Sequence, residues 1–285
     1  MMKKIIITAE SGSDIPKDLA DEYGIFLVPM HVTFNDITKD DGTFSPKDVY
    51  SYYDKDRKLP KTSGCNPSDF IKIFDEIFER YSDCHIIHMA YSSVTTCSYQ
   101  SALIAKEDNN NITLVDTKQV AVGQCAAVIK FAKELKEHPE WTVEEAVKVA
   151  VKISQSVKMC FVPSNLDYLR AGGRVSNATA LCGNILSIHP QIELLDGYLK
   201  ATKKYRGKMN KVVLSLIANY SKENMFDKKE VWFENTIGFS DDLKEEATKI
   251  AYELGYEKVN WITAGGVITT HGGPNTFCMA GFLKK

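Results

Sequence analysis

The first half of the chain alternates short apolar segments with longer segments whose apolar residues recur at helical spacing, and this alternation limits the possible folds. The strand-like segments are residues 4–8, 25–34, 84–91 and 112–115. Helical patterns lie between and after them, the longest at 122–137 and 142–157. Strands that alternate with helices form a mostly parallel sheet covered on both faces by helices. We therefore predict an α/β domain over residues 1–158.

The pattern changes after residue 158. Asp196 and Gly197 separate two strand-like segments, 191–195 and 198–203, which predicts a β-hairpin. Helices are expected at 164–171, 211–220 and 243–254, and further strands at 159–162, 231–239, 259–264, 267–270 and 276–282. This order predicts an α+β domain over residues 159–285 with an antiparallel or mixed sheet, so any ligand site at the junction would draw on both domains.

Composition excludes several classes of protein. The 285 residues carry a formal net charge of −2, which disfavours a nucleic-acid-binding protein. The seven cysteines include no C-x-x-C pair, so neither a zinc site nor a disulfide framework is indicated. No P-loop or dinucleotide fingerprint occurs, hence no cofactor is expected. No apolar run reaches the roughly 18 residues of a membrane span, and we expect a cytoplasmic protein.

The segment 86–102 joins a buried strand to a helix through a turn rich in hydroxyl groups. Ser92, Ser93, Thr95, Thr96 and Ser98 lie within seven residues. Ligands of open α/β sheets bind beyond the carboxyl ends of the strands, and helix starts attract anions. The turn is therefore a candidate anion site, although hydroxyl groups at a helix start also serve as simple caps.

Three other places offer polar groups to a ligand. Thr62 and Ser63 precede the helix that Asn66 and Pro67 are expected to begin. Arg174 follows two glycines, and His271 follows a predicted strand in a glycine-rich turn. Each of these residues could equally be an ordinary surface residue.

Catalytic signatures are weak. Ser93 is not in a G-x-S-x-G elbow, and no Asp and His complete a recognisable triad with it. His85 and His88 would point to opposite faces of a strand, so they cannot form a pair of metal ligands. An acyl- or phosphoryl-transfer enzyme that uses Ser93 and His271 remains an alternative to a binding protein.

Several motifs share an order and spacing with one known family. They are Ser11-Gly12-Ser13-Asp14, Thr62-Ser63, Ser92-Ser93, Asp116-Thr117, Tyr168 through Ser176, Ser187-Ile188-His189-Pro190, Arg206-Gly207-Lys208 and Thr270-His271-Gly272-Gly273-Pro274. Together they resemble the DegV family of bacterial lipid-binding proteins along essentially the whole chain. One departure is Asn275, which stands where the family usually has glycine.

The resemblance implies a non-catalytic protein with two α/β domains that holds one long-chain fatty acid at the domain junction. Thr62, Ser93 and His271 match the positions that hold the carboxylate in the family, with Ser63, Ser92 and Arg174 nearby. Well-understood members present the fatty acid to a separate kinase that phosphorylates the carboxylate, and Arg206 matches the basic position used in that docking. This reading requires an empty apolar cavity behind Thr62, Ser93 and His271, and these three residues close together.

Overall fold

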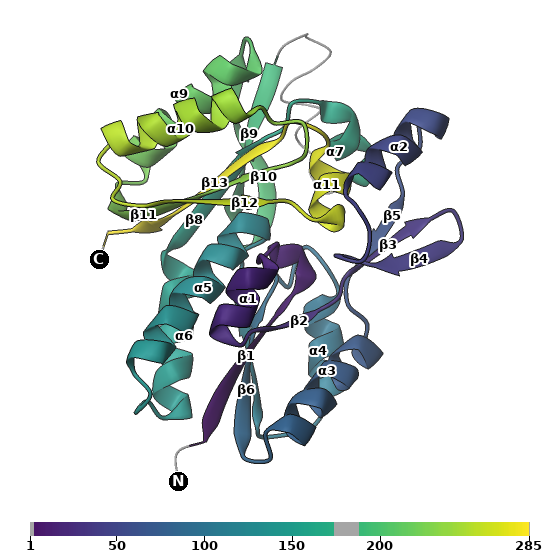
Figure 1. The fold of residues 1–285 in the computed structure, drawn as a ribbon, viewed down its shortest axis with the longest axis vertical. Helices are drawn as coiled ribbons and strands as arrows, with labels where there is room; N and C mark the ends of the chain where they lie inside the picture. The colour runs from purple at the N-terminus through teal and green to yellow at the C-terminus, as the bar shows by residue number, and fades with distance from the viewer. Residues whose placement is uncertain (1–2, 174–187, 285) are drawn as a thin grey trace.

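A computed structural model describes residues 3–173 and 188–284. In this part of the chain the strands form sheets of four, six and three strands (Figure 1). Figure 1 places the four-stranded and six-stranded sheets at opposite ends of the molecule, with the small sheet at one side between them. Together they form the predicted α/β architecture.

The four-stranded sheet is wholly parallel, as predicted. Its order is β2 (Phe26–Val28), β1 (Lys4–Glu10), β6 (Cys84–Ala90) and β7 (Ile112–Asp116). Every residue of β6 is buried, as expected for a central parallel strand. The helices of this half are α1 (Lys17–Tyr23), α3 (Pro67–Arg80), α4 (Ser98–Lys106), α5 (Ala121–Glu137) and α6 (Val143–Ser156), after a 3-10 turn at Ser11–Ser13. Figure 1 shows α3 and α4 on one face and α1, α5 and α6 on the other.

The single strand predicted at 25–34 is wrong, because Pro29 divides it. Proline has no N–H to donate to a ladder, and the Met30 N–H donates instead to Ser11 Oγ at 2.9 Å. The chain then leaves the parallel sheet and enters the small antiparallel sheet, whose order is β4 (Ile37–Asp40), β3 (His31–Phe34) and β5 (Lys61–Ser63). Thr62 and Ser63 thus lie in a strand, and α2 (Lys47–Asp56) connects β4 to β5.

The six-stranded sheet is mixed, as predicted. Its order is β10 (Tyr198–Arg206), β9 (Ile188–Leu195), β8 (Val157–Val162), β13 (Phe277–Leu283), β11 (Phe226–Asn235) and β12 (Val259–Thr263). Only β11 and β12 pair in parallel among these strands. The predicted hairpin is confirmed, with Asp196 and Gly197 both at positive φ in its turn.

Helices cover both faces of this sheet. Phe277 and Met279 of β13 pack in a cluster with α9 (Met209–Glu223) and α10 (Asp241–Glu253). Cys278 and Ala280, which alternate with them, pack in a second cluster with α5. Because α5 also contacts β1 and β6, one apolar core continues from the parallel sheet to the mixed sheet. A domain boundary at residue 158, next to the start of β8, remains our proposal.

The strand predicted at 267–270 is wrong. These residues belong to the helix α11 (Gly266–Gly272), which lies beside α7 (Leu166–Gly172). The carboxylate of Asp41 accepts hydrogen bonds from the backbone N–H groups of Gly266 at 2.7 Å and Val267 at 3.4 Å. A distant carboxylate therefore caps this helix start, and this overrides the β-propensity of the sequence. His271 lies on a helix as a result.

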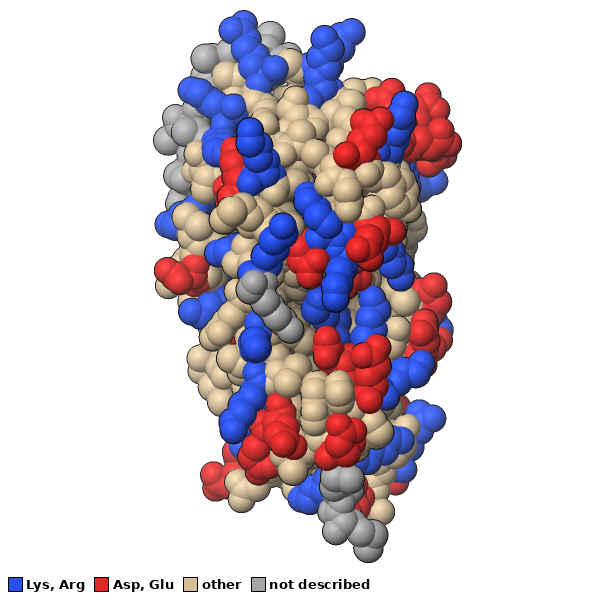
Figure 2. All heavy atoms as spheres, turned by 90° about the vertical axis from the view of Figure 1, so that its left-hand side faces the viewer, with Lys and Arg blue, Asp and Glu red and all other residues tan. Residues whose placement is uncertain are grey.

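Charges of both signs mix on the surface. On the face shown in Figure 2, lysines and arginines are interspersed with aspartates and glutamates. This distribution agrees with the near-neutral net charge of the sequence. In the described part of the chain, no helix combines the length and the apolar composition needed to cross a bilayer.

Candidate ligand-binding site

A cavity lies between the small sheet, the six-stranded sheet and the turn after β6. Its volume open to a water-sized sphere is about 90 Å³, so the cavity is narrow. Most of its wall is apolar. The apolar side chains are those of Met30, Tyr91, Val120, Ala121, Met159, Phe161, Leu169, Leu199, Val267, Ile268 and Cys278.

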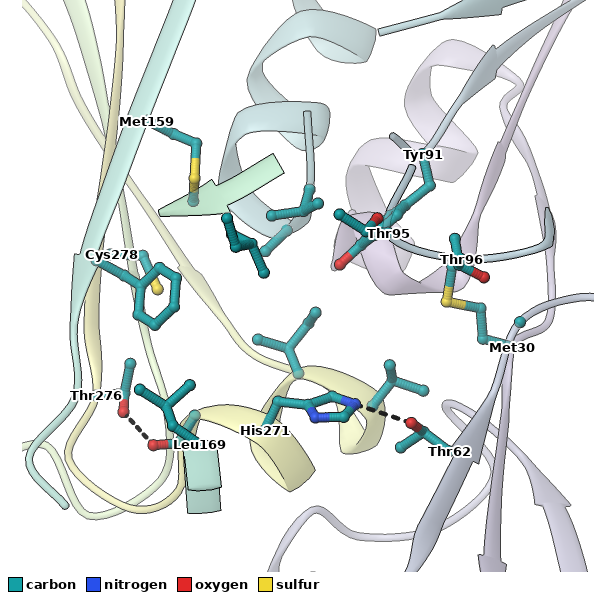
Figure 3. Close-up of a pocket in the computed structure, with 18 of the residues that line it drawn as sticks. Met30, Thr62, Tyr91, Thr95, Thr96, Met159, Leu169, His271, Thr276 and Cys278 are labelled. Atoms are coloured by element: carbon teal, nitrogen blue, oxygen red, sulfur yellow. Dashed lines mark hydrogen bonds between the residues drawn. The ribbon is translucent and has the colours of Figure 1, made fainter. Parts of the chain in front are cut away.

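The polar groups of the cavity come chiefly from hydroxyl-bearing residues. Thr62 Oγ1 and His271 Nε2 form a hydrogen bond of 2.8 Å between β5 and α11. Figure 3 shows this pair at one edge of the cavity, with Met159 across the cavity from it. Ser63, Thr95, Thr96 and Thr276 complete the polar part of the lining. The cavity thus offers a mostly apolar interior and a polar pair at one edge.

His271 is positioned by contacts on both sides of its helix. The Asp41 carboxylate holds the start of α11, and Asp14 Oδ1 accepts from the Gly265 N–H at 2.9 Å. On the other side, α7 approaches so closely that a Cβ on Gly172 would lie 2.4 Å from His271 Nδ1. Glycine is therefore required at 172 because any side chain would displace the imidazole.

Thr62 is positioned by the small sheet. It pairs with Val32 in the antiparallel β3–β5 ladder. Directly after β5, a Cβ on Gly64 would lie 2.2 Å from Thr96 Oγ1, so only glycine lets this strand approach the turn after β6. The Cys65 N–H then donates to Ser98 Oγ at 3.0 Å, which fixes that approach.

The structure brings together some of the predicted site residues. Thr62, Ser63 and His271 line the cavity, whereas Ser92 and Ser93 are not among its lining residues. Ser92 Oγ donates to the Gly197 carbonyl at 2.8 Å, and Ser93 Oγ donates to Asp116 Oδ2 at 2.6 Å.

Of the two basic residues expected to act near the ligand or a partner, the structure describes only Arg206. Arg174 falls outside the described residues, and Arg206 is exposed at the end of β10.

The expectation that Ser93 shares the cavity with Thr62 and His271 is not met in this structure, because Ser93 is not among the lining residues. Two other members of the hydroxyl-rich turn, Thr95 and Thr96, line it instead.

The sequence analysis did not identify four buried carboxylates that accept hydrogen bonds from the backbone of segments around the cavity. Glu234 Oε2 accepts from the Val122 N–H at 2.8 Å, at the start of α5. Glu10 Oε2 accepts from the Tyr91 N–H at 2.8 Å. With Asp14 and Asp41, they anchor the backbone of segments that line the cavity. Two of these carboxylates could have been predicted as site residues, because Glu10 and Asp14 flank the polar turn after the first strand.

Burial affects the pKa values of these acids in different ways. Burial and the neighbouring Glu234 carboxylate raise the pKa of Asp14 well above its usual value. Burial likewise raises the pKa values of Asp41 and Glu234. Burial also acts to raise the pKa of Glu10, but the charge of His88, 3.3 Å away, and hydrogen bonds from its neighbours lower it overall.

We expect Asp14→Asn to make the free energy of unfolding less dependent on pH. An acid with a raised folded-state pKa stabilises the fold below its unfolded pKa of about 4, and this contribution is lost as pH rises through the folded-state pKa. Asparagine keeps an acceptor for the Gly265 N–H, tolerates the φ of 54° at this position and does not ionise. The variant should therefore gain on the order of 1 kcal/mol over the wild type between pH 4 and pH 8.

Urea unfolding at several pH values measures this difference. Asp75→Asn on the exposed face of α3 is the control and should follow the wild type. If Asp14→Asn showed the wild-type slope against pH, Asp14 would not carry the proposed titration.

The family model described as "Uncharacterised protein, DegV family" matches residues 4–283. A DegV domain-containing protein of Caldanaerobacter subterraneus subsp. tengcongensis is 31% identical over 281 residues, covering 96% of this chain and 97% of that protein. A fatty acid-binding protein of Thermotoga maritima is 30% identical over 283 residues, covering 96% of each.

A solved structure shares the fold. It is that of a DegV family protein from Thermus thermophilus, described for its fatty acid binding. The TM-score is 0.87 at 23% identity, over 99% of this chain and all of the other. The topology described above is therefore that of a known architecture.

Proposed function

Because the chain belongs to the DegV family, we propose that it binds one long-chain fatty acid, with the acyl tail in the cavity and the carboxylate at Thr62 and His271. The observation that carries this proposal is an apolar cavity that meets a hydrogen-bonded Thr–His pair at one edge. Relatives described as fatty-acid-binding proteins support the choice of ligand.

The division between tail and head group has an energetic basis. Burial of a sixteen-carbon tail contributes about 0.8 kcal/mol per CH₂, so the gross gain is on the order of 10 kcal/mol before ordering costs. A buried carboxylate without partners would cost several kcal/mol. The tail therefore supplies most of the affinity, while the polar groups prevent that penalty.

We assign the carboxylate to Thr62, Ser63 and His271, which line the cavity. Ser92 and Ser93 would have to release Gly197 and Asp116 before they could contribute. Arg174 remains a proposed neighbour of the head group.

We favour a carrier over an acyl- or phosphoryl-transfer enzyme. In the alternative, Ser93 is the nucleophile and His271 its base. However, the Ser93 hydroxyl donates to Asp116, and His271 Nε2 pairs with Thr62 on the cavity wall. A separate kinase as the partner, with exposed Arg206 in its docking surface, is part of the same proposal.

Native mass spectrometry of the protein, purified without detergent, tests the proposal. We expect one fatty-acid mass per chain, which extraction with organic solvent removes. Protein that stays empty when offered fatty acids, or that turns over an acyl or phosphoryl ester, would support the enzyme instead.

We expect Thr62→Val to weaken fatty-acid binding about tenfold. Valine keeps the shape of threonine but loses the hydroxyl, and a hydrogen bond to a charged group contributes about 1.5–3 kcal/mol. Titration with a fluorescent fatty acid measures the change. Thr33→Val is the matched control, because Thr33 lies in the same small sheet and its hydroxyl pairs with Thr38 away from the cavity. Equal affinity of the two variants would remove Thr62 from the head-group site.

A further inference from the structure

Two carboxyl groups that are far apart in the sequence meet in the interior behind the cavity. Asp14 follows β1 of the parallel sheet, and Glu234 lies in β11 of the mixed sheet. Asp14 is 8% exposed, and Glu234 is fully buried. Their side chains lie within hydrogen-bonding reach of each other. The pair therefore connects the two larger sheets at a point that solvent hardly reaches.

Each acid holds part of the cavity wall. Glu234 Oε2 accepts from the Val122 N–H at the start of α5, and Asp14 Oδ1 accepts from the Gly265 N–H just before α11. Glu234 also lies opposite Cys278 in the β11–β13 ladder, and Cys278 lines the cavity. Three elements that contribute lining residues, α5, α11 and β13, thus meet at this one pair.

The other oxygen of each acid needs a proton. Asp14 Oδ2 and Glu234 Oε1 are buried and have no hydrogen-bond partner among the described residues. If both groups were ionised, two negative charges would face each other in the interior without a donor between them. One proton on the pair supplies the donor and removes one of the charges. In agreement with this, burial and the nearby Glu234 raise the pKa of Asp14 well above its usual value.

The groups that face the pair supply no positive charge. They are the Asp41 carboxylate after β4, the Cys125 thiol of α5 and the Cys278 thiol of β13. Within residues 3–173 and 188–284, no lysine, arginine or histidine forms an ion pair with Asp14 or Glu234. Lys133 of α5 is paired with Glu230 instead. A proton is therefore the simplest way to neutralise one of the two charges.

We propose that Asp14 and Glu234 are positioning residues for lipid binding, which share one proton while the cavity is closed around the acyl tail. The inference rests on the proposed function, because it concerns the affinity of the cavity for that tail. A bound tail excludes water from the wall at Cys278, so a second charge behind this wall is less favourable in the lipid-bound state than in the empty one. The bound state therefore holds the proton more tightly, and lipid affinity falls as pH rises through the titration of the pair.

The ratio of lipid affinities at pH 7 and pH 9 tests the proposal. Palmitate and hexadecanol are the probes, and the hydroxyl of hexadecanol does not ionise in this range. We expect the wild type to bind both lipids about tenfold more weakly at pH 9, the effect of a one-unit difference in pKa between the bound and empty states. Asp14→Asn and Glu234→Gln cannot carry two charges, so their hexadecanol ratios should be close to one. Asp75→Asn on the exposed face of α3 is the control and should follow the wild type.

Infrared spectroscopy of the lipid-free protein tests the shared proton without any ligand, and thermal unfolding at both pH values shows that each variant is folded. The difference spectrum between the wild type and either variant should contain the band of a protonated carboxyl group at pH 7. Absence of this band, or equal hexadecanol ratios for the wild type and both variants, would overturn the inference. Failure of the wild type to bind either lipid while the band is present would instead overturn the proposed function, and with it the link to binding.

Discussion

Replacement of Ile268 by tryptophan is expected to abolish fatty-acid binding while the protein stays folded. Ile268 is half-buried on α11, and its side chain lines the cavity. An indole there occupies space that the acyl tail needs. Because the tail supplies most of the affinity, displacement of only four or five methylene groups costs about 3–4 kcal/mol, a loss of at least 100-fold.

Fluorescent fatty-acid titration gives the affinity, and thermal unfolding shows that the fold persists. Ile104→Trp is the control, because Ile104 is 61% exposed on α4 and is not a cavity residue. A variant Ile268→Trp that binds like the wild type would place the tail somewhere other than this cavity.

Replacement of Asp41 by alanine is expected to lower the free energy of unfolding by about 2–4 kcal/mol. Asp41 is 8% exposed, and its carboxylate accepts from the N–H groups of Gly266 and Val267. Alanine leaves these buried donors without an acceptor, and each such donor costs about 1–3 kcal/mol. Fatty-acid affinity should fall as well, because α11 carries His271.

Urea unfolding measures the effect, and two further variants control it. Asp41→Asn keeps an acceptor oxygen and should recover much of the stability. Asp36→Ala changes an exposed acid of the same segment and should have little effect. Wild-type stability of Asp41→Ala would show that α11 does not depend on this cap.

Local signals in the sequence were sufficient for much of the fold. Asn66 caps α3 through hydrogen bonds from Ser68 and Asp69, as its sequence neighbours indicated. The hairpin turn at Asp196 and Gly197 was equally predictable from these two residues. Asn275 has a φ of 58°, which explains how asparagine serves where the family usually has glycine.

Features that depend on contacts between residues far apart in the sequence could not be predicted from local patterns. The helix α11 owes its start to Asp41, which lies 225 residues before Gly266. Residues 36–42 contain β4 and the buried Asp41, and nothing near them in the sequence points to Gly266.

The hydroxyl-rich turn shows the same limit for the site. Its composition indicates that hydrogen bonds will form but does not name their partners. Ser93 pairs with Asp116 at the end of the neighbouring strand β7, while Thr95 and Thr96 reach the cavity. Thr62 and His271 are 209 residues apart, and their proximity was predicted from the family resemblance and not from their spacing.

A crystal structure of the protein with a palmitate analogue brominated at its methyl end tests the central claim most directly. The account predicts the carboxylate within hydrogen-bonding distance of Thr62 and His271, and the anomalous signal of bromine inside the apolar cavity. Bromine outside the cavity, or a carboxylate at the end remote from Thr62, would contradict it.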